Sequence, residues 1–246
     1  MSRSIPSDQS IRPIFAAIRT VPIAAKSTTE KTRAPVAAPF ITISREPGTE
    51  ASSLAQALVE ALNAEESGEQ KWSCWDRALV EKVAADPRAS SELFDCVEDV
   101  DHSWMRDFLS SLSFTDDESH ADEAKTYSRV AATIRAVAQR GRAVIVGRGG
   151  VFITRRMPGG IHILLVAPFE KRVACVARKL NISSESAATY IRQMERNRQA
   201  FYRRYWSAES LNPEEFTMCL NAAELDTPTM VEMIRMLVRR RASLPQ

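Results

Sequence analysis

The stretch Phe40-Ile-Thr-Ile-Ser-Arg-Glu-Pro-Gly-Thr-Glu-Ala-Ser-Ser-Leu-Ala-Gln-Ala-Leu58 indicates the fold more clearly than any other part of the chain. It begins with a β-rich run, continues through a turn that contains one glycine, Gly48, and ends in a segment with helical apolar spacing. A strand that leads through a turn into a helix directs backbone N–H groups and the positive end of the helix dipole at one place, which favours a bound phosphate. The stretch therefore predicts a strand, a phosphate loop and a helix, with Glu50 inside the turn.

Compared with the full phosphate-loop sequence G-x-x-x-x-G-K-[ST], this turn lacks the lysine that contacts the outer phosphates. Counting from Gly48, Glu50 and Ala51 stand where a glycine and the lysine would stand, and Ser52 and Ser53 stand where a metal-binding hydroxyl would. The alternative interpretation is an ordinary strand-to-helix turn, with Ser52 or Ser53 acting only as a helix cap. That is the more common meaning of a single glycine before a helix, and the local sequence leaves both interpretations open.

The carboxylate of Glu50 bears directly on phosphate binding. A carboxylate about 5 Å from a phosphate charge, at an effective dielectric constant near 20, costs on the order of 3 kcal/mol, or roughly a hundredfold in affinity. The side chain avoids this cost if it points outward or binds a magnesium ion. Both arrangements are compatible with the sequence.

Composition limits the classes of protein that need to be considered. With 246 residues, of which 44% are hydrophobic and 26% charged, the chain is long enough for one large α/β domain. The net charge of +2 argues against a function in nucleic-acid binding. The four cysteines show no C-x-x-C spacing, and no apolar stretch approaches the roughly 18 residues of a membrane span. We therefore expect a cytoplasmic protein with no membrane partner.

Residues 1–39 differ in composition from the rest of the chain. Ser, Thr, Pro, Ala and basic residues dominate there, and Asp8 and Glu30 are its only acids. This composition predicts a disordered N-terminal tail, followed by one domain over residues 40–246. An arginine-rich, acid-poor start is also compatible with an organelle transit peptide.

Strands alternate with helices from residue 40 onward. Apolar periodicity predicts strands at 41–44, 71–75, 143–147 and 161–167. Helices are predicted at 53–63, after Asp76, and at 90–112, 124–140, 169–180, 183–206 and 227–241, with residues 113–122 as an exposed loop. This order predicts an α/β fold, with a doubly wound parallel sheet that binds ligands at the carboxyl ends of its strands.

Arginines follow two of these elements. The segment Val146-Gly-Arg-Gly-Gly150 places Arg148 in a glycine-flanked turn after a buried strand, where it can grip a phosphate or pair with a neighbouring acid. The predicted helix to Trp206 carries Arg196 on one face and Arg198 on another. Phosphoryl transfer develops negative charge that such arginines can stabilise, whereas a solvated arginine face is the alternative interpretation.

Together these segments resemble the cytidylate kinase-like family of P-loop nucleoside monophosphate kinases over roughly residues 40–225. The order and spacing of several motifs carry the resemblance, rather than any single one. The motifs are Ile41-Thr-Ile-Ser-Arg-Glu46, Trp75-Asp76-Arg77-Ala-Leu79, Val144-Ile-Val-Gly-Arg-Gly149, Val166-Ala-Pro-Phe-Glu-Lys-Arg172, Arg196-x-Arg198-x-x-x-Tyr202 and Cys219-Leu-Asn-Ala222.

The resemblance implies a three-layer, P-loop NTPase-like sheet with a helical lid. It also implies transfer of phosphate from ATP, with Mg²⁺, to a small nucleotide such as cytidylate or another nucleoside monophosphate. By the same resemblance, the donor phosphate loop is formed by Gly48, Thr49, Ser52 and Ser53, with Ser53 as the metal ligand. The acceptor is bound by Asp76, Arg148 and Arg178, and the lid region begins at Arg172 or Arg178. The transferring phosphate is contacted by Arg148, Arg196 and Arg198.

The main departure from the family is in the phosphate loop. Its usual Gly-Ser-Gly-Gly run is Gly48-Thr-Glu-Ala51 in this chain. Glu50 and Ala51 therefore favour an alternative, a catalytically impaired nucleotide-binding or regulatory interaction module. The arginines retained in the other motifs favour an active kinase.

Overall fold

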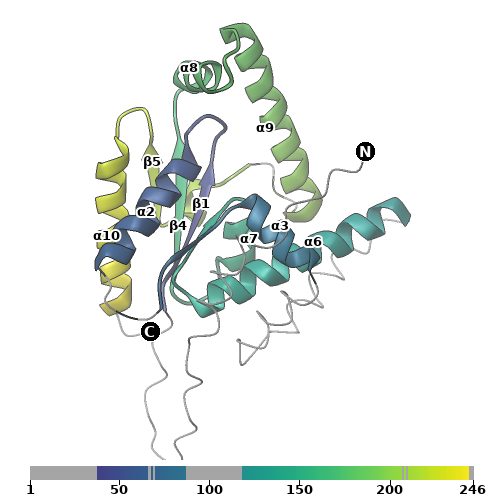
Figure 1. The fold of residues 1–246 in the computed structure, drawn as a ribbon. Helices are drawn as coiled ribbons and strands as arrows, with labels where there is room; N and C mark the ends of the chain where they lie inside the picture. Colours follow the sequence, from purple (N-terminus) through teal and green to yellow (C-terminus); the bar gives the residue numbers. More distant parts are fainter. Residues whose placement is uncertain are drawn as a thin grey trace, which may run out of the picture.

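Strands and helices alternate to form a parallel sheet covered on both faces (Figure 1). The computed structural model describes residues 38–65, 68, 70–86, 118–206, 208 and 210–243, with side chains from residue 125 onward in the helix that begins at 118. Within these residues the strand order is β2-β3-β1-β4-β5, and every neighbouring pair is parallel. The strands are β1 (Phe40–Arg45), β2 (Ser73–Trp75), β3 (Ala143–Val146), β4 (Gly160–Val166) and β5 (Met218–Asn221).

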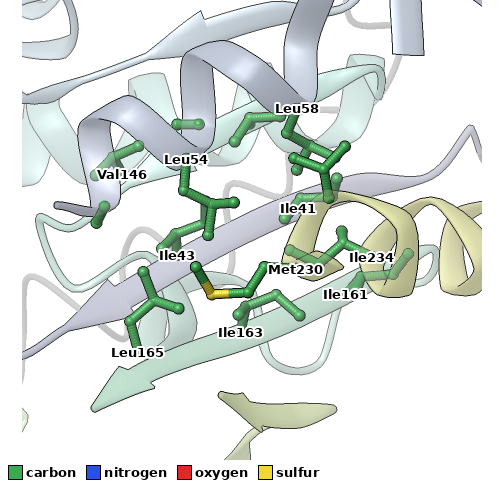
Figure 2. Close-up of a cluster of buried hydrophobic side chains, with 14 of the residues drawn as sticks. Ile41, Ile43, Leu54, Leu58, Val146, Ile161, Ile163, Leu165, Met230 and Ile234 are labelled. Carbon is green, nitrogen blue, oxygen red and sulfur yellow. The ribbon is translucent and has the colours of Figure 1, made fainter. Parts of the chain in front are cut away.

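Two hydrophobic clusters, one on each face of the sheet, make the fold three-layered. Helices α2 (Ala51–Glu65) and α10 (Thr227–Ser243) cover one face, where Ile43 of β1, Leu54 of α2 and Ile234 of α10 are buried together (Figure 2). Helices α3 (Arg77–Ala85), α6 (Glu118–Arg140) and α7 (Gly150–Thr154) cover the other face. Strands β3 and β4 are buried on both faces and mostly apolar, as expected of central parallel strands.

Helices α8 (Phe169–Leu180) and α9 (Ser184–Trp206) extend beyond the carboxyl edge of the sheet (Figure 1). They pack against each other through a small cluster of their own, Val176, Ala187 and Ile191. Asn181 takes the left-handed conformation that ends α8 (φ +54°), which turns the chain back into α9. This pair is the helical lid that the sequence predicts, and it lies over the edge where parallel strands bind ligands.

Most element boundaries lie within a few residues of the predicted ones, but some elements differ. Helix α6 begins at Glu118 rather than at residue 124, so residues 118–122, which the sequence predicts as loop, are helical. The short elements α7, β5 and the 3-10 turn Pro213–Glu215 were not predicted, because three to five residues give too little periodicity.

Two predicted segments lie largely outside the described residues. They are the N-terminal tail, of which residues 1–37 are not described, and the helix at 90–112. Among the helices that are described, none has the length and apolar character that a membrane span requires.

Candidate functional site

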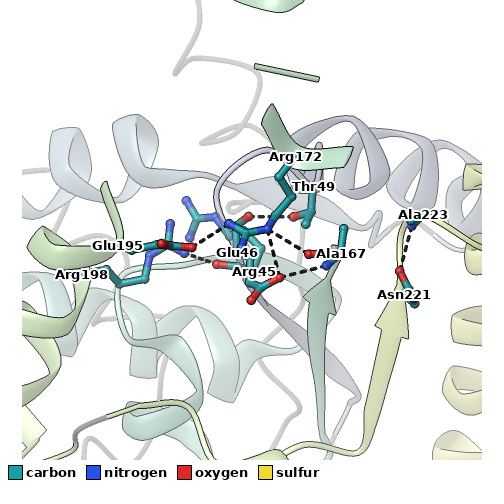
Figure 3. A network of polar contacts seen from close by, with 9 residues as sticks. All are labelled: Arg45, Glu46, Thr49, Ala167, Arg172, Glu195, Arg198, Asn221 and Ala223. Carbon is teal, nitrogen blue, oxygen red and sulfur yellow. Dashed lines mark hydrogen bonds and ion pairs between the residues drawn. The ribbon is translucent and has the colours of Figure 1, made fainter. Parts of the chain in front are cut away.

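The turn between β1 and α2 lies where the sequence predicts a phosphate loop (Figure 3). Gly48 has φ +90°, and a Cβ at this position would lie 2.9 Å from the backbone oxygen of Arg172 in α8, so the turn passes too close to α8 for a side chain. Thr49 Oγ1 donates a hydrogen bond to the backbone oxygen of Glu46 (2.9 Å). The backbone oxygen of Glu50 accepts the first hydrogen bonds of α2, at 3.0 and 3.2 Å. The strand, turn and helix therefore meet as the sequence predicts.

Glu50 has a backbone conformation that glycine adopts more easily, with φ +53°. Its exposed side chain lines a cavity of about 360 Å³ together with Gly48, Ala51 and Ser52, whereas Ser53 does not line it. We call this the loop cavity; α8 and α9 form its opposite wall. Ala51 is buried, with 5% of its surface exposed. Because alanine is uncharged, this position lacks the positive charge that the lysine of a full phosphate loop would supply.

Arg172 connects the phosphate loop, β4 and the lid (Figure 3). Its Nε donates to the backbone oxygen of Ala167 (2.9 Å) and lies 3.4 Å from the carboxylate of Glu46, while its Nη1 donates to Glu195 of α9 (2.7 Å). Glu46 also accepts from the backbone N–H of Ala167 (2.9 Å). Since Arg172 is only 6% exposed, breaking these contacts would leave a buried charge without partners. The network therefore holds the first turn of α8 against the loop.

Four arginines gather beside the loop cavity at the ends of β1, β2 and β3 and on α9. Arg45, Arg77, Arg148 and Arg198 line a second cavity of about 280 Å³, which we call the arginine cavity. Both Arg77 and Arg148 lie 3.0 Å from the carboxylate of Glu81, and among the described residues no other carboxylate forms an ion pair with any of the four. Counted over the part of the chain that the structure describes, the cavity therefore carries an excess of positive charge, which suits an anion.

The position of Arg45 depends on a neighbouring glycine. A Cβ on Gly147, which has φ +78°, would lie 1.7 Å from a guanidinium nitrogen of Arg45, so the arginine occupies the space that a side chain would need. Arg198 donates a hydrogen bond to the backbone oxygen of Arg45. Burial, together with the charges of Arg198, Arg77 and Arg148, lowers the pKa of Arg45 to about 10. Arg45 still carries its charge at neutral pH, and a bound anion would relieve the repulsion.

An aromatic cavity of about 620 Å³ adjoins Arg148 between α6 and α9. Its walls include Tyr127, Phe201 and Tyr205, and the guanidinium of Arg148 lies 5.9 Å from the ring of Tyr127 and 5.7 Å from that of Phe201. Burial raises the pKa of Tyr127 well above its ordinary value, so its hydroxyl stays protonated and donates to the backbone oxygen of Arg148 (3.0 Å). This bond supports the strained backbone of Arg148, which has φ +52°.

The remaining predicted site residues lie outside these three cavities. The side chain of Asp76 caps α3 by accepting from a backbone N–H of its first turn (2.9 Å). Arg178, in the last turn of α8, makes a side-chain contact with Cys175. Arg196 is exposed and donates to Gln193 on its own helix (2.6 Å). The structure therefore brings together Gly48, Thr49, Ser52, Arg148 and Arg198, but not these three or Ser53.

Sequence reasoning missed three basic side chains that line the loop and arginine cavities, Arg45, Arg77 and Lys179. Arg45 is the last residue of β1 and Arg77 the first of α3, just after β2. Their positions at the carboxyl ends of two strands of one parallel sheet were the available signal. Lys179 carried no comparable signal, because its position depends on how the lid packs.

Comparison with known proteins gives one family and a set of similar folds. The model of the cytidylate kinase-like family matches residues 40–224. No curated protein matches the chain. An uncharacterized protein from Eubacterium ventriosum ATCC 27560 has a similar structure, with a TM-score of 0.62 and 19% identity over 82% of this chain and 98% of that one.

Two further solved structures are more distant in geometry. Shikimate kinase from Bacteroides thetaiotaomicron has a TM-score of 0.44 and 15% identity over 82% of this chain and 98% of that one. TT1252 from Thermus thermophilus has a TM-score of 0.42 and 18% identity over 84% of this chain and 99% of that one. At these identities, structural similarity speaks to the fold alone.

Proposed function

Because the chain belongs to the cytidylate kinase-like family, we propose that it transfers the γ-phosphate of ATP to a nucleoside monophosphate, such as cytidylate. The observation that supports this function best is that Arg45 and Arg198 line both the loop cavity and the arginine cavity. A phosphoryl group has to pass between a donor site and an acceptor site. Two guanidinium groups at the junction are placed to stabilise the charge that develops on it.

The other residues divide between donor and acceptor. The donor phosphates lie against the turn at Gly48, where backbone N–H groups and the positive end of α2 favour anions. The acceptor phosphate lies against Arg148 and Arg77, and the rest of the acceptor lies in the aromatic cavity beside Phe201. Catalysis in this arrangement comes from positioning and from neutralisation of charge.

A magnesium ion would accompany the donor. Magnesium in kinases usually keeps several waters and takes one or two protein oxygens together with nucleotide phosphates. The hydroxyl of Ser52 fits this role because it lines the loop cavity, and it is better placed than Ser53, on which the sequence-based expectation rested. When bound, the ion neutralises part of the phosphate charge.

The second candidate function is a regulatory or interaction module of the same fold that binds a nucleotide without turning it over. Glu50 in the loop and Ala51 in place of a lysine favour this candidate. The arginine cavity favours the kinase. A module without turnover has no need for four arginines around a cavity that adjoins the donor site.

An ADP-release assay tests the proposal. The full chain is incubated with ATP and magnesium, and ADP is measured across a panel of nucleoside monophosphates and in their absence. We expect turnover with at least one monophosphate, well above the rate with ATP alone. Calorimetric binding of ATP without turnover would favour the second candidate. Neither binding nor turnover would reject both.

A further inference from the structure

One lysine of the lid, Lys179, lines the loop cavity. Lys179, in the last turn of α8, lines this cavity together with Gly48, Glu50 and Ala51. We propose that the ammonium group of Lys179 contacts the donor phosphates, in the role that a lysine at position 51 has in a full phosphate loop. This inference rests on the proposed function and adds to it a phosphate-binding residue from a different element.

The spacing of residues along α8 supports the placement of Lys179. Arg172 and Lys179 are seven residues apart, which is close to two helical turns, so they lie on the same face of the helix. The backbone at Arg172 is in contact with the turn at Gly48, and the network around Arg172 fixes this end of α8. The face that carries Lys179 therefore points along the loop cavity, and a flexible side chain of four methylenes reaches into it.

The charges around Cys175 support the same placement. Burial and the carboxylate of Glu50 raise the pKa of the Cys175 thiol, while Arg178 and Lys179 lower it. The thiol is thus close both to the carboxylate of the loop and to the basic end of α8. A lysine at this place opposes the repulsion that Glu50 exerts on a phosphate and supplies the positive charge that Ala51 lacks.

Binding measurements on the full chain test the proposal. The affinities of ATP, inorganic tripolyphosphate and adenosine are measured by calorimetry with magnesium for the unmodified chain and for Lys179→Met, Lys179→Arg and Lys171→Met. Lys171 is the matched control, since it is exposed in the first turns of α8 and does not line the loop cavity. We expect Lys179→Met to weaken ATP and tripolyphosphate by about tenfold, which is the size of one charge-assisted contact. Adenosine should bind equally to all variants, and Lys179→Arg and Lys171→Met should resemble the unmodified chain.

A second comparison separates direct contact from simple neutralisation of Glu50. In a Glu50→Gln background, the loss caused by Lys179→Met should persist if the lysine contacts phosphate, and it should disappear if the lysine only balances the carboxylate. Disappearance would overturn the inference, as would unchanged ATP affinity in Lys179→Met alone, and both results leave the proposed function intact. Failure of the unmodified chain to bind ATP would overturn the inference and the proposed function together.

Discussion

Glu50 combines an unfavourable backbone conformation with an unfavourable charge. Its φ of +53° suits glycine or asparagine better than glutamate, and its side chain lines the cavity in which we place the donor phosphates. Replacing this residue changes both properties, so a single substitution does not separate them. Three substitutions, compared with one another, separate the effect of the backbone conformation from the effect of the charge.

We expect Glu50→Gly and Glu50→Asn to tighten ATP binding by about tenfold, because both remove the carboxylate and tolerate a positive φ. Glu50→Gln should recover only part of this gain, since it removes the charge and keeps the backbone cost. Calorimetric titrations with and without magnesium measure the effect. If all three substitutions instead abolish magnesium-dependent binding, then Glu50 is a metal ligand and the repulsion argument is wrong.

Arg148 pairs with Glu81, but it does so as one of two arginines on the same carboxylate. In Arg148→Met, Glu81 keeps its contact with Arg77, so we expect the melting temperature to change by only a few degrees. Loss of one charge-assisted contact should raise the KM for the acceptor by about tenfold to a hundredfold, or about 1.5 to 3 kcal/mol. A collapsed fold with normal acceptor affinity in the folded fraction would show that the ion pair with Glu81 is the main role of Arg148.

At the scale of the elements, β1 and β4 share a buried histidine. His162 of β4 is 7% exposed and lies 2.8 Å from Thr42 of β1, measured from its Nδ1 to the threonine hydroxyl. Burial lowers its pKa to about 4, with a smaller effect from the charge of Arg241. The neutral imidazole is therefore part of the folded sheet.

This histidine predicts a loss of stability in mild acid. The unfolded chain takes up a proton near pH 6.5 and the folded chain only near pH 4, so the stability present above pH 6.5 is lost as the pH falls toward 4. From pH 7.5 to pH 5 this amounts to about 2 kcal/mol. Urea denaturation at the two pH values measures it, and His162→Gln should flatten the dependence. An equally steep dependence in that variant would assign the effect to other groups.

The sequence predicted the long elements and the turn at Gly48 between the first strand and its helix, because apolar periodicity and turn residues are local properties. The helix from Phe169 to Leu180 has the bounds that were predicted. The edge strand β5 was missed, because it is four residues long and only Leu220 within it is buried. Short elements of this kind are fixed by tertiary pairing, here with β4, and not by their own pattern.

The candidate site was predicted only in part for a similar reason. Motifs located Gly48, Arg148 and Arg198, but they gave no indication that Arg196 lies outside the cavities or that Arg172 is buried in a network of its own. Which face of α9 meets the loop depends on packing between helices far apart in the chain. The same holds for Lys179.

At the scale of the whole molecule, we expect residues 40–246 to fold without the N-terminal segment. The family match begins at residue 40, and residues 1–39 show no periodic apolar face to bury. Removing residues 1–38 should leave the melting temperature within a few degrees of that of the full chain, as measured by scanning calorimetry. A larger decrease would show that the segment packs against the domain.

The central claim is that phosphate passes between two cavities that meet at Arg198 and Arg45. The most direct measurement follows transfer of γ-labelled phosphate from ATP to a nucleoside monophosphate by the unmodified chain, by Arg198→Met and by Arg203→Met, an exposed arginine of α9 outside the three cavities. We predict a labelled nucleoside diphosphate with the unmodified chain, a rate lower by about a hundredfold in Arg198→Met, and little change in Arg203→Met. No labelled diphosphate with any acceptor, or equal rates in Arg198→Met and the unmodified chain, would contradict the claim.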